Sequence, residues 1–528
     1  MNAPSTRRDF LKTTGVISAC TLLGTTATAC GGTAVGAATL SAAEQFELTA
    51  TQALSALNAK SMTAEAYVTN LIARGESLET LNAMITWDKT KAIAAAKQVD
   101  SDRAAGKPLG SLAGLPIVIK DNINTRGIKT TGGTKALENI VPTKNAPSVQ
   151  KLLDAGAIIL GKTNLHELAF GVTSTNFYLG INADGTAKKP CKNPYNTAKI
   201  PGGSSGGTAV SIAARFAPAG LGTDTGGSSR VPAAMCGIAG FRPSVGDGLN
   251  KGRRYNDVNA VVPISHTRDT IGPMARTVAD IALIDSVITG SAIPAPSNLK
   301  GLRFGIPSSL WSNLEPDVEK VVMLVKRKLE DAGVIFVNID TSDLLPLNDK
   351  ISFQIALHEP ISDIPAYLME TGYPNISLAD INAGISSPDV KGAFSAILGD
   401  VFGNSYNDAL TNFRPQLQNI YKNYFSKNNL QALFFPTTPI TASDINVTKG
   451  SDKVIINGVS LDQFGTIIRN TDPGSNAGIP GLSIPAGLTD SGLPVGVEID
   501  GVLGSDVQIL SIGMAMEKVL GSLISPKL

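Results

Sequence analysis

The sequence predicts a single large α/β domain in which a mixed, twisted sheet is covered by helices on both faces. Short apolar segments alternate with amphipathic segments along most of the chain, which is typical of strands alternating with helices. Glycine-rich turns follow several of the predicted strands, at the positions where sites form in such sheets. With 528 residues, 43% of them hydrophobic and 17% charged, the chain is long and apolar enough for a large core.

The N-terminus is predicted to be a targeting segment and not part of the fold. Arg7 and Arg8 form a twin-arginine pattern, followed by an apolar stretch over 16–23 and by small residues at 27–29. That stretch is too short to span a bilayer, which takes about 20 residues. We therefore expect residues 1–29 to be a twin-arginine signal peptide, residues 30–45 a flexible linker, and residues 46–528 the folded domain. The expected location is the periplasm, with or without a lipid anchor at Cys30.

The elements of the folded domain follow from hydrophobic periodicity and turn residues. In the first part we expect helical segments over 44–74 with a turn at 58–62, a strand and helix over 83–98, a buried strand at 115–119, and a helix, turn and strand over 149–161. In the second part we expect an amphipathic helix over 317–333, a strand at 334–337, a helix-rich stretch over 347–428, a buried strand and turn over 432–439, and paired strands over 481–501.

Two serine-bearing glycine turns are the most informative motifs. They read GGSSGG at 202–207 and TGGSSR at 225–230, and each precedes a segment with helical character. A serine on such a turn suits a hydroxyl nucleophile, because the N–H groups at the start of a helix can face an oxyanion. Ser204 and Ser228 are separated by one predicted helix and one predicted strand. We therefore expect both turns at the same edge of the sheet.

Lys120 ends a buried apolar strand and is the candidate base. Burial lowers the pKa of a lysine, which makes the neutral, basic amine accessible. The alternative is a structural salt bridge between Lys120 and the adjacent Asp121. The presence of two serine turns favours the catalytic interpretation.

Together these segments resemble the amidase signature family, from about residue 46 to the C-terminus. The motifs that carry the resemblance are GLPIVIKDN (114–122), GKTNLHELAFG (161–171), NPYN (193–196), GGSSGG (202–207), GTDTGGSSRVPAA (222–234) and GPMARTVAD (272–280). Within the family, the TSTN, PGGSSGG and RVPAAMCG runs are most similar to mandelamide hydrolases and related arylacetamide amidases. The resemblance implies hydrolysis of linear amides to a carboxylate and ammonia or an amine, through an acyl-enzyme.

The resemblance also implies roles for individual residues. Ser228 would be the nucleophile, Ser204 the bridging serine on a cis peptide bond after Gly203, and Lys120 the base. The oxyanion hole would be formed by main-chain N–H groups of Thr225, Gly226, Gly227 and Ser228. Supporting roles would fall to Ser205, Asp224 and Arg230. The expected substrate pocket contains Phe170, Thr175, Phe177 and Tyr178, with its walls formed by variable segments at 173–179 and in parts of 347–425.

Several other functions are weighed against this one. Within the family, an aryl acylamidase, a peptide amidase and a carbamate hydrolase stay open. GGSSG also satisfies the G-x-S-x-G pattern of α/β-hydrolase esterases, with Ser204 as nucleophile and His266 or His358 as base. That interpretation leaves Lys120 and the second serine turn without a role. An amidotransferase subunit is disfavoured by the export signal, since its partners would be cytoplasmic.

The remaining composition indicates few partners other than a small-molecule amide. The net charge of +1 gives no electrostatic basis for binding nucleic acid or a membrane surface, so membrane contact would come only through a lipid on Cys30. No cofactor or metal is expected, because the chain has no HExxH, CxxC or P-loop spacing. Cys191 and Cys236 either form a disulfide or remain separate thiols. The sequence gives no indication of oligomeric state.

Overall fold

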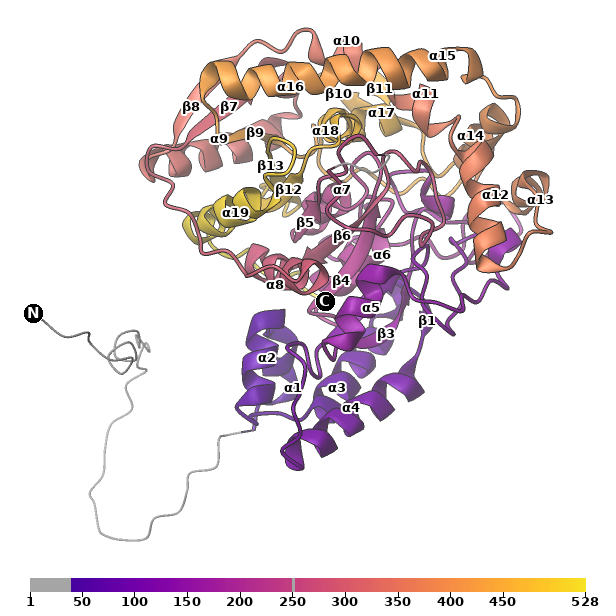
Figure 1. Cartoon of the computed structure of the whole chain (residues 1–528), viewed down its shortest axis with the longest axis vertical. Helices are drawn as coiled ribbons and strands as arrows, with labels where there is room; N and C mark the ends of the chain where they lie inside the picture. Colours follow the sequence, from indigo (N-terminus) through magenta and orange to yellow (C-terminus); the bar gives the residue numbers. More distant parts are fainter. Residues whose placement is uncertain (1–38, 249–251) are drawn as a thin grey trace, which may run out of the picture. The chain divides into compact units, whose positions relative to one another are not determined.

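One large mixed sheet organises the chain in the computed structural model, which describes residues 39–248 and 252–528 (Figure 1). Within these ranges the sheet has 11 strands in the order β1-β3-β2-β4-β6-β5-β12-β13-β9-β7-β8. Their bounds are β1 Met84–Trp87, β2 Pro116–Lys120, β3 Ile158–Thr163, β4 Ala219–Asp224, β5 Ala239–Arg242, β6 Thr270–Ala275, β7 Arg303–Pro307, β8 Ile335–Ile339, β9 Ala432–Pro436, β12 Gly481–Leu488 and β13 Pro494–Asp500. A separate hairpin pairs β10 (Lys453–Ile456) with β11 (Val459–Asp462).

Strand direction makes the sheet mixed, as predicted. β3, β2 and β4 are parallel to one another, and so are β9, β7 and β8. The strands between these two groups pair antiparallel, among them β12 with β13, which are the predicted paired strands near the C-terminus. The predicted α/β fold with a mixed sheet is confirmed.

The α-helices occupy most of the segments that the periodicity indicated. They are α1 Ala42–Glu47, α2 Ala50–Asn58, α3 Ala64–Ser77, α4 Lys89–Ala104, α5 Pro147–Asp154, α6 Gly206–Ala213, α7 Arg230–Cys236, α8 Val278–Thr289, α9 Pro316–Asp331, α10 Leu344–Asn348, α11 Ser352–Ala356, α12 Pro360–Thr371, α13 Leu378–Gly384, α14 Pro388–Leu398, α15 Gly403–Asp408, α16 Arg414–Asn428, α17 Gln463–Ile468, α18 Asp472–Ala477 and α19 Asp506–Leu520.

Helices cover both faces of the sheet, and the alternation of side chains along β12 shows how. Successive residues of a strand point to opposite faces. A Cβ on Gly481 would lie 3.2 Å from Arg230 of α7, whereas Leu482 and Ile484 contact Gly513 of α19 on the other face. The predicted two-sided arrangement of helices is therefore present.

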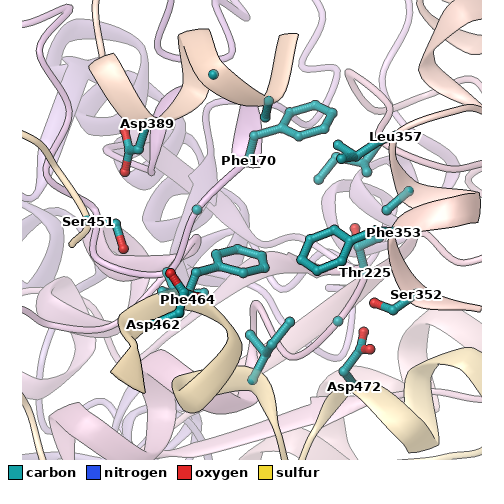
Figure 2. A pocket seen from close by; sticks show the side chains of 18 of the residues that line it. Phe170, Thr225, Ser352, Phe353, Leu357, Asp389, Ser451, Asp462, Phe464 and Asp472 are labelled. Carbon is teal, nitrogen blue, oxygen red and sulfur yellow. The ribbon is translucent and has the colours of Figure 1, made fainter. Parts of the chain in front are cut away.

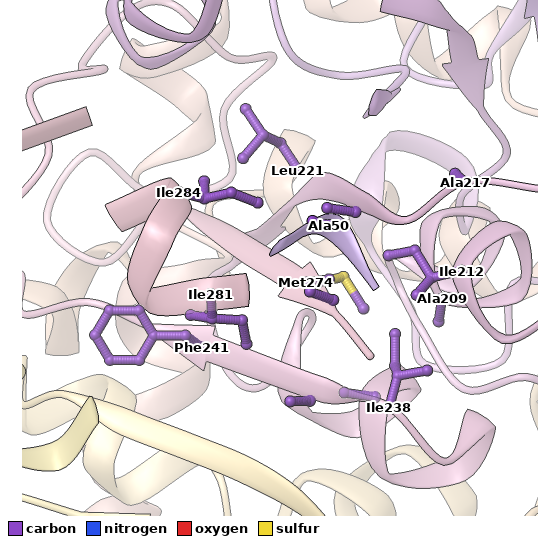
Figure 3. Packing of buried hydrophobic residues seen from close by; sticks show 14 of the residues in the cluster. Ala50, Ala209, Ile212, Ala217, Leu221, Ile238, Phe241, Met274, Ile281 and Ile284 are labelled. Atoms are coloured by element: carbon purple, nitrogen blue, oxygen red, sulfur yellow. The ribbon is translucent and has the colours of Figure 1, made fainter. Parts of the chain in front are cut away.

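The central strands hold the largest apolar core. Figure 3 shows part of it, where Leu221 of β4, Met274 of β6 and Phe241 of β5 pack near Ile281 and Ile284 of α8. These side chains are at most 1% exposed. Burying a side chain of this kind contributes about 1.5–3 kcal/mol to folding. The core fixes the strands whose ends carry the polar residues discussed below.

The folded domain begins earlier than predicted at its N-terminus. The predicted signal peptide (1–29) and Cys30 lie outside the described residues. The predicted linker (30–45) is wrong at its C-terminal end, because α1 begins at Ala42. Ser41 caps this helix and forms a reciprocal capping box with Glu44, which satisfies N–H groups at its start. Among the residues described, no helix combines the length and apolar character needed to cross a bilayer.

Candidate active site

Lys120 and Ser204 meet at the edge of the sheet where β2 and β4 end. These strands are parallel neighbours, so their carboxyl ends lie side by side. The Nζ of Lys120 donates hydrogen bonds to Ser204 Oγ at 2.7 Å and to Thr223 Oγ1 at 2.8 Å. Both Lys120 and Ser204 are fully buried. The structure thus brings together two of the three residues for which the resemblance implied catalysis.

Burial changes the acid–base character of Lys120. Desolvation lowers the pKa of its amine to about 7, and the opposing attraction of Asp224 and Asp269 only partly offsets this effect. The partners within hydrogen-bond distance are neutral hydroxyls, which do little to retain the proton. The amine can therefore be neutral, and act as a base, near physiological pH.

Asp121 does not pair with Lys120, although the two are adjacent in sequence. Its carboxylate lies 3.5 Å from the Nζ of Lys162 on β3, and both side chains are fully buried. Its other oxygen accepts hydrogen bonds from the main chain and hydroxyl of Thr131. The salt-bridge alternative for Lys120 is therefore not what the structure shows.

The two serine turns lie against each other. The N–H of Ser205 donates to the carbonyl oxygen of Ser228 at 3.1 Å. The Oγ of Ser205 donates to Thr223 O at 3.2 Å, which joins the first turn to β4 as well. The peptide bond between Gly203 and Ser204 is cis. Ser205 thus connects both turns to the strand that ends between them.

Gly227 allows the second turn its shape. Its φ of +133° lies in a region that side chains rarely adopt, and a Cβ there would lie 2.2 Å from the hydroxyl of Thr471. The turn leads directly into α7, and Ser228 is only half-buried because it lines a cavity. Ser228 can therefore be reached by a ligand, whereas Lys120 and Ser204 are fully buried and do not line the cavity.

A buried ionic network supports the second serine turn. Asp224 accepts hydrogen bonds from Gly227 N at 2.9 Å, from Ser229 Oγ at 2.8 Å and from the guanidinium of Arg230 at 3.0 and 3.1 Å. Burial alone would raise the pKa of Asp224, but Arg230 and Arg242 outweigh it and hold that pKa well below its usual range. Arg230 is fully buried and also pairs with Glu498. Asp224 and Arg230 thus shape the turn and do not face the cavity.

The predicted oxyanion donors are not equivalent. The N–H of Gly227 is already bound to Asp224, so it is not free to bind an oxyanion. Within the described ranges, no acceptor is recorded for the N–H groups of Thr225, Gly226 and Ser228. Thr225 and Gly226 line the same cavity as Ser228. Of the four N–H groups that the resemblance implied, the one on Gly227 is therefore not available to bind an oxyanion.

A cavity of about 550 Å³ opens in front of Ser228. Three phenylalanines, Phe170, Phe353 and Phe464, project into it from different segments (Figure 2). Of the four predicted pocket residues only Phe170 lines it. Thr175 and Phe177 are buried elsewhere, at 0% and 2% exposure, and Tyr178 is not part of the lining either.

The cavity also contains residues that the sequence did not identify one by one, although several of them lie in the expected segment 347–425. They come from α11, α14, the β10–β11 hairpin and α17, and include Phe353, Phe464, Ala393 and Asp389. None of these segments carries a glycine motif or a conspicuous spacing. The aromatic residues in the helix-rich stretch after residue 347 were the only signal in the sequence.

The three histidines are engaged away from Ser204 Oγ. His266 contacts Asp363 at 2.9 Å, His358 contacts Asp400 at 2.7 Å, and the ring of His166 lies near Asp389. The esterase alternative needed His266 or His358 beside Ser204, and the structure places Lys120 there instead. Cys191 and Cys236 are separate buried thiols, so the possible disulfide is not formed.

One group of side chains in the described ranges has the composition of a metal site. Ligand atoms of His266, Glu359 and Asp363 lie within 4.8 Å of one another. The Glu359 carboxylate already accepts hydrogen bonds from Ser265 and Thr267, and Asp363 is bound to His266. These oxygens are therefore satisfied by protein donors.

Comparison with known proteins agrees with this geometry. The Amidase family matches residues 66–510. The chain is 40% identical over 494 residues to mandelamide hydrolase of Pseudomonas putida, covering 90% of this chain and 92% of the relative. It is 40% identical over 476 residues to indoleacetamide hydrolase of Rhizobium radiobacter, covering 89% and 96%.

The fold agrees as well. A crystal structure of an amidase superimposes with a TM-score of 0.77 at 28% identity, covering 90% of this chain and all of the other. The family match extends over most of the chain and includes both serine turns and Lys120. The chain therefore belongs to the amidase family and is a hydrolase of amides.

Proposed function

We propose that Ser228, Ser204 and Lys120 form the catalytic triad of this amidase. The observation that carries the proposal is the 2.7 Å hydrogen bond between the buried Lys120 amine and Ser204 Oγ, on a turn that is hydrogen-bonded to the accessible Ser228. Because the pKa of Lys120 is lowered to about 7, a large fraction of the amine is neutral and can accept a proton near neutral pH. The hydrogen bond from Ser205 to Ser228 keeps the two serine turns together.

In this mechanism the Oγ of Ser228 attacks the carbonyl carbon of the amide. Its proton passes to Ser204 as the proton of Ser204 passes to Lys120. The main-chain N–H groups of Thr225, Gly226 and Ser228 face the negative oxygen of the tetrahedral intermediate. The protons return along the same route to the leaving nitrogen, and ammonia or an amine departs. Water then hydrolyses the ester on Ser228 to release the carboxylate.

The substrates proposed for the site are amides of aryl-substituted acetic acids. The three phenylalanines of the cavity provide an apolar, aromatic environment for the acyl group, and a volume of about 550 Å³ exceeds what a single ring requires. The relatives named mandelamide hydrolase and indoleacetamide hydrolase, both 40% identical, support an aryl acyl group. We propose further that the enzyme is exported through the twin-arginine signal, to the periplasm or to a lipid anchor at Cys30.

Ammonia release tests the substrate class. We would compare mandelamide, phenylacetamide and indoleacetamide with propionamide, using Ser228→Ala as the blank. The expected result is faster release from the aryl amides, with no release from any substrate by the folded Ser228→Ala protein. Turnover retained in Ser228→Ala would overturn the assignment of the nucleophile.

A pocket variant separates the triad from the acyl specificity. Phe464→Ala is expected to raise KM for phenylacetamide about 10-fold and to leave propionamide within about 2-fold, because a lost apolar contact in a pocket is worth about 1–3 kcal/mol. Phe402→Ala is the matched control, since this phenylalanine lies outside the cavity. Hydrolysis of anilides or peptide amides but not of arylacetamides would keep the triad and reject the aryl acyl proposal.

A further inference from the structure

His166 is a buried residue whose main chain contacts Ser204, and the proposed triad chemistry does not use its ring. It is fully buried, and its main-chain N–H donates to the carbonyl oxygen of Ser204 at 3.1 Å. The ring packs on the backbone of Gly171, where a Cβ would lie 2.2 Å from Nε2. The orientation of the imidazole is therefore closely defined by its surroundings.

The two ring nitrogens have different surroundings. Nδ1 accepts from the main-chain N–H of Ser174 at 3.2 Å and of Thr173 at 3.4 Å, so it carries no proton. Nε2 lies 3.2 Å from Oδ2 of Asp389, but the two atoms do not form a hydrogen bond. The ring is therefore held by its contacts at Nδ1 and by packing.

Ser174 links the ring to the turn that holds Ser204. Its Oγ donates to the carbonyl oxygen of Gly202 at 2.9 Å and accepts from the N–H of Gly206 at 3.2 Å. The Ser174 hydroxyl thus binds the first serine turn on both sides of Ser204. Ser174 itself has a φ of +55°, an uncommon conformation for a residue with a side chain. The hydrogen bond to His166 Nδ1 helps to hold it there.

The same segment is tied to the wall of the substrate cavity. Asp389 lies in the first turn of α14, and Gly392, Ala393 and Ala396 of that helix line the cavity. The carboxylate of Glu167 accepts from the main-chain N–H of Ser387, at the start of this helix, at 2.7 Å. Figure 2 shows Asp389 at the edge of the cavity. One set of contacts therefore connects the acyl pocket to the serine turn.

We propose that His166, through its hydrogen bond with the main chain of Ser174, is a positioning residue that keeps Ser204 Oγ aligned between Lys120 and Ser228. This inference rests on the proposed triad, in which Ser204 relays the proton. Without the acceptor at Nδ1, Ser174 loses its support and the turn can shift. A misplacement of about 1 Å at a reacting group can cost roughly 100-fold in rate. The loss then falls on kcat and leaves KM largely unchanged, because Ser204 does not contact the bound acyl group.

Two substitutions at His166 distinguish the two nitrogens. His166→Gln retains a donor near the position of Nε2 but removes the acceptor for Ser174, and we expect kcat to fall 10- to 100-fold with KM within 2-fold. His166→Asn retains an acceptor near Nδ1 and is expected to keep at least 5-fold more kcat than His166→Gln. The assay measures hydrolysis of p-nitrophenyl acetate and of phenylacetamide by the folded enzyme, checked by circular dichroism.

Ser174→Ala provides a test with little risk to folding, since it removes one hydroxyl. Its kcat is expected to fall at least 10-fold, and the double variant with His166→Gln is expected to be no slower than the slower single variant. Ser211→Ala is the matched control, because this buried hydroxyl binds the carbonyl of Gly207 in α6 and does not contact Ser204. Its kcat should be unchanged.

The outcomes separate this inference from the proposed triad. If Ser228→Ala and Ser204→Ala retain hydrolysis of p-nitrophenyl acetate, the triad itself is rejected. If those variants are inactive but folded His166→Gln or Ser174→Ala has kcat within 2-fold of the native enzyme, only the positioning role is rejected. Fully multiplicative losses in the double variant, or a rise in KM at constant kcat, would also overturn it.

Discussion

Two lysines on neighbouring strands are buried equally deeply but have different partners. Lys120 ends β2 and Lys162 lies on β3, and both are fully buried. The register pairs Lys162 with Ile119, so the two side chains leave the sheet on opposite faces. The Nζ of Lys162 lies 3.5 Å from the carboxylate of Asp121 and donates to Thr130 Oγ1 and Ile123 O. The Nζ of Lys120 donates to the hydroxyls of Ser204 and Thr223 and has no carboxylate in an ion pair with it among the described residues.

The difference shows that depth alone does not decide what a buried lysine does. Burial lowers the pKa of both amines, to about 8 for Lys162 and about 7 for Lys120. Asp121 acts against that shift at Lys162 and holds the charged form in an ion pair. The hydroxyl partners of Lys120 can instead pass a proton to it. Lys162 therefore stabilises the fold, and Lys120 is available as a base.

Removing each amine in turn gives the largest expected contrast. Lys120→Met should reduce kcat/KM by about 10²–10⁴-fold, the usual contribution of a general base. Burial disfavours the charged lysine, so between about pH 7 and 10.5 the native state binds fewer protons than the unfolded chain. The unfolding free energy of the native enzyme therefore rises with pH over this range. Lys120→Met should therefore be more stable than the native enzyme at pH 7, and the gap should close toward pH 10.5. Unchanged activity would remove Lys120 from the mechanism.

Lys162→Met should behave in the opposite way. It leaves the Asp121 carboxylate buried without its cation, which costs about 3–5 kcal/mol of unfolding free energy, as measured by urea denaturation. Activity of the folded fraction should stay within about 3-fold of the native value. Adding Asp121→Asn should recover part of the lost stability, because the uncompensated charge is removed. A stable but inactive Lys162→Met would show that this lysine also takes part in catalysis.

The pH profile of kcat/KM sharpens the comparison further. The reacting form of Lys120 is neutral, so kcat/KM should rise through about pH 7, level off above it, and fall about tenfold per pH unit well below it. Steady-state rates with phenylacetamide between pH 5 and 9 measure this rise, which we call the acidic limb of the profile. A flat profile, or one that declines through pH 7, would contradict a neutral lysine base.

Thr223→Val should give the smallest effect. The Thr223 hydroxyl accepts from Lys120 at 2.8 Å and from the amide of Asn122 at 3.0 Å. An accepting oxygen favours the ammonium form, so its loss should move the acidic limb to lower pH by less than one unit and lower kcat about 2- to 10-fold. Thr208→Val, in α6 and hydrogen-bonded to Thr163, serves as the control. A shift to higher pH would contradict the hydrogen-bonding scheme.

The meeting of Lys120 with the first serine turn was predictable because the signals for it are local. Serine turns at the starts of α6 and α7, and a lysine at the end of a buried strand, are each contained within a few consecutive residues. The strand order then brings them together. The alternation of side chains along a strand also explains why adjacent Lys120 and Asp121 do not pair.

The substrate cavity was not predictable in the same way. Phe353, Asp389 and Phe464 come from separate helices, with no spacing that relates them, and only tertiary packing brings them to Phe170. Thr175 and Phe177 lie near the GKTNLHELAFG motif but pack into the interior. Likewise, the sequence could not show that the N–H of Gly227 donates a hydrogen bond to Asp224, because that contact depends on the conformation of the turn.

The unequal exposure of the three triad residues has a practical consequence for chemical labelling. Ser228 borders the cavity, whereas Lys120 and Ser204 are fully buried. A fluorophosphonate should therefore modify Ser228 in the native enzyme. A water-soluble amine-reactive reagent should modify Lys120 only in molecules that have unfolded. Mass spectrometry of both adducts in one sample would then count competent and unfolded enzyme separately, without any substrate.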